Sequence, residues 1–166
     1  MGGIAVNGLG HHHPAIVEAL DRAKDMMHCS NYYYNEPAVQ VCKLICENSC
    51  FEKVLFANSG AEANECAIKI ARKYGEKRGA YRIVTLENSF HGRTLTTLAA
   101  TGQEGFHREF LPLTEGFLYA QAGDLAGIQA LLDGSVCAVM LEMVQGEGGV
   151  IPMDEGFVKG LAQLCR

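Results

Sequence analysis

Apolar residues recur at helical spacing in the first third of the chain. After Pro14 they come every three or four positions, which predicts a helix that begins at this proline. A second helix is predicted from near Pro37, with an apolar stripe at Val41, Leu44 and Ile45. The three histidines at 11–13 precede the first of these helices and favour a turn.

The periodicity changes after residue 52. Residues 53–57, which are apolar after Lys53, predict a buried strand, and residues 58–60 predict a turn. A long helix should follow and end near Gly75 or Gly79, with an apolar side made by Ala63, Ala67, Ile70, Ala71 and Tyr74. Further strands are predicted over 81–86 and over 136–141, the second of them a buried one. Helices are predicted over 125–132 and 157–164, and a long loop over 102–112.

This alternation of strands and helices predicts the fold class. An α/β domain is expected, with a mostly parallel sheet that has helices on both faces. We expect residues 1–50 to form an N-terminal segment and residues 51–166 to form part of a larger ligand-binding domain, cut at both ends.

Composition narrows the possible functions. The chain has 166 residues, with 14 basic and 19 acidic residues and a net charge of −5, which disfavours nucleic acid as a partner. Its apolar runs are shorter than the ~18 residues that span a bilayer, and the first residues lack the pattern of a signal peptide, so no membrane contact is expected. Seven cysteines, an odd number, favour reduced thiols and a cytoplasmic location.

The first candidate site lies between the run at 53–57 and the long helix. Ser59 precedes Glu62 by three residues, the spacing of a capping box, so Ser59 is predicted to cap this helix. The N–H groups of Gly60 and Ala61 would then point away from the helix and attract an anion such as phosphate. A helix cap with no ligand fits the same pattern.

Two further polar motifs follow predicted strands. Residues 88–94 contain Phe90, which suits stacking on an aromatic ring, and Arg93, which suits binding of a carboxylate. Residues 141–149 contain Glu142 and, between two glycines, Glu147. Open α/β sheets bind ligands at the carboxyl ends of their strands, so the three motifs are expected to meet in one crevice. Taken singly, the last two also fit a surface loop and a tight turn.

Together, these motifs resemble those of the class III, pyridoxal-phosphate-dependent aminotransferases. The similarity runs through nearly the whole chain, at residues 3–7, 10, 11, 14, 31–37, 58–65, 90–94 and 145–149. The resemblance implies part of the large domain of fold type I, pyridoxal 5'-phosphate as the cofactor, and a homodimer with sites at its interface. The complete chain of such an enzyme is considerably longer than this one.

The resemblance also implies roles for individual residues. Ser59, Gly60 and Ala61 match the loop that binds the cofactor phosphate, and Phe90 matches the residue stacked on the pyridine ring. The residues expected on the substrate side are Arg93, which matches the arginine that binds the amino-acid carboxylate, Tyr34, Glu142 and Glu147.

Two groups that the family requires have no match in this sequence. They are the aspartate that pairs with the ring nitrogen and the Schiff-base lysine, and both are expected beyond Arg166. None of the seven lysines has a matching context, so no catalytic residue is assigned. We therefore expect the chain to be a fragment that is inactive alone, since the proton shuttle of transamination needs that amine.

The implied reaction moves an amino group from N-acetylornithine to 2-oxoglutarate, as in arginine biosynthesis. His91 between Phe90 and Gly92 favours this donor, with ornithine, succinylornithine, succinyl-diaminopimelate and 4-aminobutyrate as alternatives. A different class, a non-catalytic module that binds a phosphate-bearing ligand, stays open.

No metal site is expected, because residues 11–13 lack a nearby carboxylate or cysteine and the cysteines at 42, 46 and 50 do not have the spacing of known clusters.

Overall fold

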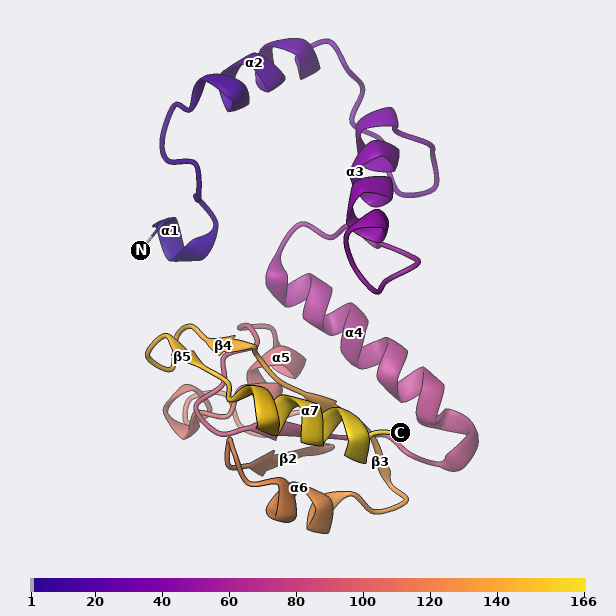
Figure 1. Cartoon of the computed structure of the whole chain (residues 1–166), viewed down its shortest axis with the longest axis vertical. Helices are drawn as coiled ribbons and strands as arrows, with labels where there is room; N and C mark the ends of the chain where they lie inside the picture. The colour runs from indigo at the N-terminus through magenta and orange to yellow at the C-terminus, as the bar shows by residue number, and fades with distance from the viewer. Residues whose placement is uncertain (1) are drawn as a thin grey trace. The chain divides into compact units, whose positions relative to one another are not determined.

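The computed structural model describes residues 2–166. The chain divides into two compact units, Met1–Val54 and Leu55–Arg166, whose elements are labelled in Figure 1. The predicted roles of residues 1–50 and 51–166 stay predictions. Within residues 2–166, no helix has both the length and the apolar character needed to cross a membrane.

The first unit contains the two predicted helices. They are α2 (Pro14–Ala23) and α3 (Glu36–Glu47), preceded by a short left-handed turn, α1 (Gly2–Ala5). His13 caps α2, because its Nδ1 accepts a hydrogen bond from the Ala15 N–H over 3.2 Å. Asn35 caps α3 in the same way through the Ala38 N–H. Residues 11 and 12 form a turn before α2, so the turn predicted at the histidines is confirmed.

The apolar stripes of this unit are not buried within it. No residue of α2 or α3 is buried, and Leu20 and Leu44 are 66% and 63% exposed. The helical spacing of these residues was predictable from the sequence, whereas their burial depends on what packs against them.

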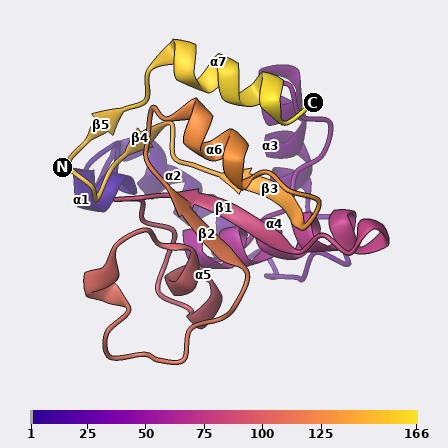
Figure 2. The same ribbon diagram turned by 90° about the horizontal axis from the view of Figure 1, so that it is seen from below.

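The second unit is built on a parallel sheet of three strands. They are β1 (Arg82–Leu86), β2 (Phe117–Ala120) and β3 (Val136–Met140), in the order β2-β1-β3 (Figure 2). Val84 in the central strand pairs with Leu118 on one side and Val139 on the other. The strands predicted over 81–86 and 136–141 are therefore confirmed.

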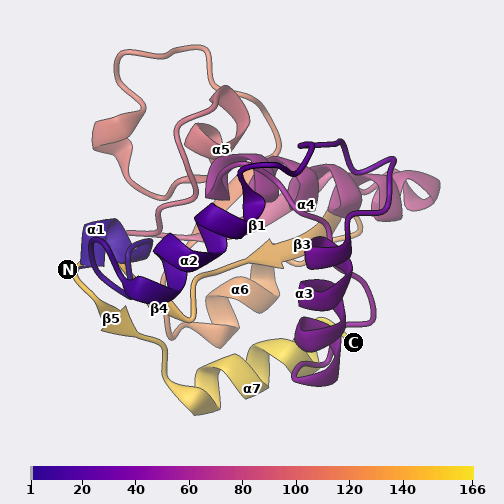
Figure 3. The ribbon, with the colours of Figure 1, turned by 90° about the horizontal axis from the view of Figure 1, so that it is seen from above.

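Helices cover both faces of this sheet. α4 (Gly60–Gly75) and α5 (Leu95–Ala100) lie on one face, and α6 (Leu125–Leu131) and α7 (Glu155–Leu164) lie on the other, as Figures 2 and 3 show. Side chains alternate along β1, so Ile83 packs against Ile68 of α4 and Ala100 of α5. The predicted α/β fold, parallel sheet and two helical layers are confirmed.

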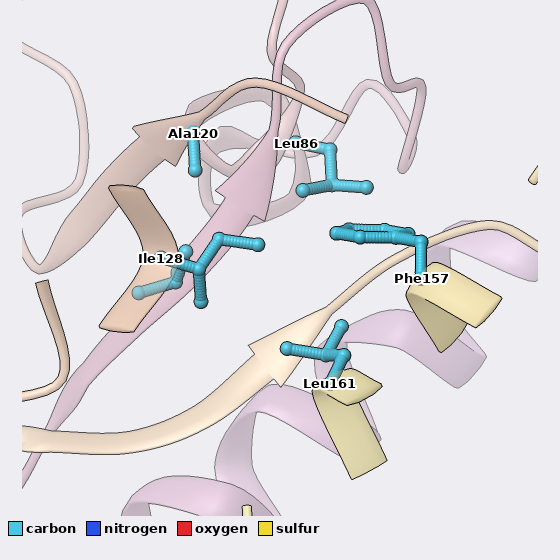
Figure 4. Packing of buried hydrophobic residues seen from close by; sticks show 6 residues of the cluster. Leu86, Ala120, Ile128, Phe157 and Leu161 are labelled. Atoms are coloured by element: carbon cyan, nitrogen blue, oxygen red, sulfur yellow. The ribbon is translucent and has the colours of Figure 1, made fainter. Parts of the chain in front are cut away.

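The larger core lies under α6 and α7. Val84 and Leu86 of β1 contact the buried side chains shown in Figure 4, which are Ala120, Ile128, Phe157 and Leu161. Burial of such apolar side chains contributes ~1.5–3 kcal/mol each to the free energy of unfolding. This core fixes the strand ends that carry two of the three polar motifs.

Three predictions about the second unit are wrong. Residues 53–57 form no strand, and Leu55 is 59% exposed, because an apolar run becomes a strand only beside a partner and the sheet in residues 2–166 places none there. The packed side of α4 is Ile68, Ala71 and Gly75. Of the five residues predicted for this side only Ala71 packs there, since Ile70 and Tyr74 are mostly exposed. β3 is half-buried rather than buried because it is an edge strand of the sheet.

Several short elements were not predicted. They are β2, α5, the antiparallel pair β4 (Val144–Gln145) and β5 (Ile151–Pro152), and 3₁₀ turns at Glu76–Arg78 and Glu104–Phe106. The last of these interrupts the loop predicted over 102–112. Elements of two to six residues carry too little periodicity to stand out in a sequence.

Candidate active site

The sheet has a switch point between β1 and β3. β1 and β3 are neighbours, but the chain leaves β1 toward α5 on one face and leaves β3 toward α7 on the other face. Loops that depart to opposite faces open a crevice outside the carboxyl ends of the strands, where α/β proteins bind ligands. The second and third polar motifs are these two loops, residues 88–94 and 141–149.

The first motif forms the capped N-terminus of α4. The Ser59 hydroxyl oxygen accepts a hydrogen bond from the Glu62 N–H over 3.2 Å, so the predicted cap is confirmed. The Glu62 carboxylate accepts from the Asn58 N–H over 2.6 Å, one residue earlier than a standard capping box. Within residues 2–166, the N–H groups of Gly60 and Ala61 have no hydrogen-bond acceptor.

The surroundings of Gly60 suit an incoming anion. A Cβ atom at this position would meet nothing within 4 Å, so the space beside the helix end is open. Free N–H groups and the positive end of the helix dipole then face the same space. The hydrogen of the Ser59 hydroxyl is also free to donate, because its oxygen serves only as the acceptor for Glu62.

Loop 88–94 is tied to the first two turns of α4. Asn64 Nδ2 donates to the His91 carbonyl oxygen over 2.7 Å, and the Thr94 hydroxyl donates to a Glu65 carboxylate oxygen over 2.5 Å. The helix end that suits an anion and the loop that carries Phe90 and Arg93 are therefore held at a fixed spacing.

Gly92 allows this close approach. Its φ is +136°, and a Cβ atom there would lie 2.5 Å from Thr97 Oγ1 and 2.9 Å from the Ala61 Cβ. A residue with a side chain would be strained by its backbone conformation and would also push the loop away from α4.

Phe90 and Arg93 lie together on the loop. The half-buried Phe90 ring meets Phe106 edge to face, with ring centroids 5.8 Å apart. The Arg93 guanidinium carbon lies 5.7 Å from the Phe90 centroid and 4.9 Å from the Phe106 centroid. No carboxylate of residues 2–166 forms an ion pair with Arg93. Its exposed side chain can therefore bind the carboxylate of a small molecule.

The third motif contacts the second directly. A Glu142 carboxylate oxygen accepts a hydrogen bond from the Phe90 N–H over 2.9 Å. The buried side chain of Gln145 donates to the Glu87 carbonyl oxygen over 2.9 Å. These contacts cross the switch point and hold the loop after β3 against the loop after β1.

Gln103 adds a further link between these loops. Its Nε2 donates to the Ser89 carbonyl oxygen over 3.1 Å and to a Glu147 carboxylate oxygen over 2.8 Å. Sequence reasoning missed Gln103, because its partners lie 14 and 44 residues away and no local pattern marks it. Asn64 and Glu65 were missed for the same reason.

His91 is the most strongly perturbed titratable group near the motifs. Its ring is only 3% exposed, and burial lowers its pKa from 6.5 to about 4. Its backbone N–H donates to Thr101 Oγ1, while its Nε2 has no partner in the described part of the chain. The imidazole is therefore neutral at pH 7.

The structure thus brings most of the predicted site residues into one network. The seven from the second unit lie on three connected segments; they are Ser59, Gly60, Ala61, Phe90, Arg93, Glu142 and Glu147. Tyr34 belongs to the first unit, where its ring is 98% exposed. The assignment of these residues to cofactor and substrate stays a prediction.

The open N-terminus of α4, the Phe90 ring and the Arg93 side chain are the three features that the resemblance to class III aminotransferases predicts for this site. Residues 1–166 match the family model for class-III aminotransferases, so the chain belongs to that family. It is 52% identical to an acetylornithine aminotransferase from Caldanaerobacter subterraneus and 49% identical to a succinylornithine transaminase from Salmonella paratyphi B. These alignments cover 98% and 99% of this chain. The sequence prediction of the family is therefore confirmed.

Solved structures agree with this placement. An ornithine aminotransferase from Toxoplasma gondii, described with partial occupancy of PLP at its active site, matches 99% of this chain with a TM-score of 0.89 and 31% identity. A taurine:2-oxoglutarate aminotransferase from Bifidobacterium kashiwanohense, solved with PLP and glutamate, matches 95% with a TM-score of 0.81 and 28% identity. The chain spans about two fifths of the length of each of these relatives.

Proposed function

We propose that the complete protein is a pyridoxal-phosphate-dependent aminotransferase that moves an amino group from an N-acylated ornithine to 2-oxoglutarate. This chain would supply the contacts to the cofactor phosphate, the cofactor ring and the substrate carboxylate. The observation that carries the proposal is the open N-terminus of α4, held by hydrogen bonds to the loop that presents Phe90 and Arg93.

The residues present fit the cofactor. Ser59, Gly60 and Ala61 offer a hydroxyl hydrogen and two free N–H groups to phosphate oxygens, beside a helix dipole that favours negative charge. The half-buried ring of Phe90 is suited to stack on the pyridine ring. When bound, pyridoxal phosphate supplies the electron sink for chemistry at the carbon that bears the amino group.

On the substrate side, Arg93 would bind the donor carboxylate with two parallel hydrogen bonds, which a lysine cannot supply. Tyr34 and Glu147 are each proposed to contact the substrate, as the resemblance implies. The lysine that bonds to the cofactor has no counterpart among the residues in this chain. Three of its lysines form ion pairs on exposed helix surfaces; they are Lys43, Lys73 and Lys159. We therefore propose that the 166-residue chain alone has no turnover.

The choice of donor rests on the relatives. An acetylornithine enzyme and a succinylornithine enzyme have similar identity to this chain, 52% and 49%, and both names specify an acylated ornithine. We take N-acetylornithine as the preferred donor and N-succinylornithine as the alternative. The remaining parts of the proposal are a homodimer, a cytoplasmic location and a place in arginine biosynthesis.

The test is a comparison of donors with the complete protein, reconstituted with pyridoxal phosphate and supplied with 2-oxoglutarate. Glutamate formation should show the highest kcat/KM with N-acetylornithine or N-succinylornithine, ahead of ornithine and 4-aminobutyrate. Absence of glutamate with all four donors would overturn the proposal. Reversible cofactor binding without turnover would favour a non-catalytic module instead.

A further inference from the structure

Glu142 uses both of its carboxylate oxygens on backbone N–H groups. One oxygen lies 2.9 Å from the Phe90 nitrogen, 52 residues away in the chain, and the other lies 3.4 Å from the Gly146 nitrogen. No lysine, arginine or histidine of residues 2–166 forms an ion pair with Glu142. The two N–H groups are therefore its hydrogen-bond partners in the described structure.

The bond to Phe90 differs from its neighbours in the same loop. The N–H groups of residues 88–91 all donate hydrogen bonds, and three of their acceptors belong to β1 or to the segment that follows α5; they are Leu86, Thr101 and Gly102. Only the Phe90 N–H donates to a residue from the other side of the switch point. Glu142 therefore couples the backbone of Phe90 to the end of β3.

The surrounding contacts make this coupling stiff. Gln145 is buried and donates to the Glu87 carbonyl oxygen, so the loop after β3 is fixed on both sides of Glu142. A hydrogen bond to an ionised carboxylate is stronger than one to a neutral acceptor. Loss of the carboxylate would leave the half-buried Phe90 N–H unpaired and would remove the one bond in this stretch that ties Phe90 to the end of β3.

We propose that Glu142 is a positioning residue that fixes Phe90 through its backbone N–H, rather than a group that binds the substrate. The proposal rests on the proposed function, because Phe90 matters only if a cofactor ring stacks on it. It changes the role that the resemblance implies for Glu142. A positioning role needs a hydrogen-bond acceptor at this place, whereas an electrostatic contact with substrate needs the negative charge.

Glutamine separates these two roles. Glu142→Gln keeps a carbonyl oxygen that can accept from the Phe90 N–H, but it removes the charge and the second acceptor, which makes only the long 3.4 Å contact with the Gly146 N–H. Glu142→Ala removes both acceptors and the charge. Glu155→Ala is the control, because Glu155 is an exposed residue of α7 whose one ion pair within residues 2–166 is with the exposed Lys159. Each variant is made in the complete protein and compared with wild type by three measurements. They are the Kd for pyridoxal phosphate, the KM and kcat for N-acetylornithine, and the Tm.

The expected result is that Glu142→Ala raises the Kd for pyridoxal phosphate by about tenfold, the scale of one lost hydrogen bond, while Glu142→Gln stays within about twofold of wild type. The proposal is overturned if both variants raise the donor KM and leave the cofactor Kd unchanged. It is also overturned if Glu142→Ala lowers only the Tm. If wild type itself binds no pyridoxal phosphate, the proposed function fails and this inference fails with it. If wild type binds pyridoxal phosphate but the two variants do not show the expected Kd values, this inference is overturned and the proposed function stands.

Discussion

Gly148 packs so closely on Asn88 that a Cβ atom at position 148 would lie 2.5 Å from the Asn88 carbonyl oxygen. Asn88 itself has a φ of +61°, so its carbonyl direction is set by a left-handed turn. The two residues bring the loop after β3 against the loop after β1 without a side chain between them. The contact between the two loops at the switch point depends on this close approach.

Gly148→Ala should therefore separate the two loops. We expect a loss of about 1–3 kcal/mol in the free energy of unfolding and a weaker affinity of the complete protein for pyridoxal phosphate, because the backbone cannot yield as a side chain would. Gly146→Ala is the matched control, since a Cβ atom there meets nothing within 4 Å. Equal effects of the two substitutions on Tm and cofactor Kd would contradict the packing described here.

Gly92→Ala tests the contact between loop 88–94 and α4. Its positive φ and the 2.5 Å approach to Thr97 Oγ1 predict a cost of about 1–3 kcal/mol and displacement of the loop. The KM for the donor should rise, because Arg93 follows Gly92 directly. Gly105→Ala, with open space around its Cβ, should leave both the Tm and the KM near wild type. A wild-type KM in the Gly92 variant would disprove the link.

The sequence predicts the parts of this site that are local. Ser59 as a helix cap follows from a serine three residues before a glutamate, and the structure has the cap. The parallel sheet follows from alternating apolar runs and helical periods. The links between the motifs were not predictable, because Asn64 and His91 lie 27 residues apart and Glu142 and Phe90 lie 52 apart.

The failed predictions share a physical cause. The run at 53–57 and the apolar side of α4 have the right composition for burial, but burial also requires a neighbouring element to cover them. Local sequence gives the apolar pattern and not its partner. Ile70 and Ile68 are the same residue type on one helix, yet they are 63% and 2% exposed.

Ser59 caps α4 and is proposed to bind the cofactor phosphate, and substitutions can separate these two roles. Ser59→Asp keeps a good helix cap but brings a negative charge to the open end of α4. We expect a Tm near wild type and a loss of at least tenfold in affinity for pyridoxal phosphate. Ser59→Ala should instead cost about 1 kcal/mol of stability with a smaller loss of affinity. Unchanged cofactor affinity in Ser59→Asp would show that the phosphate binds elsewhere.

Arg93 is expected to recognise the donor carboxylate. Arg93→Lys keeps a positive charge but loses the planar, paired donors, so the KM for N-acetylornithine should rise by about tenfold or more. An amine donor that lacks a carboxylate should show little difference between wild type and variant. Equal losses with both donors would point to a general disturbance of the site rather than to carboxylate binding.

The buried His91 predicts a pH dependence of stability. Its pKa is lowered to about 4 in the folded protein, against 6.5 for an unfolded chain, so the unfolded state binds more protons between these values. The free energy of unfolding should therefore fall as the pH drops from 6.5 toward 4, by up to about 3 kcal/mol from this residue. In His91→Asn, this part of the fall in Tm between pH 7 and pH 5 should disappear. A variant that loses as much Tm as wild type would contradict the prediction.

The most direct test of the account is a crystal structure of the complete protein with pyridoxal phosphate bound. The account predicts phosphate oxygens within hydrogen-bonding distance of the Gly60 and Ala61 nitrogens and of the Ser59 hydroxyl, with the pyridine ring stacked on Phe90. A phosphate bound away from the N-terminus of α4, or a ring that does not contact Phe90, would contradict it.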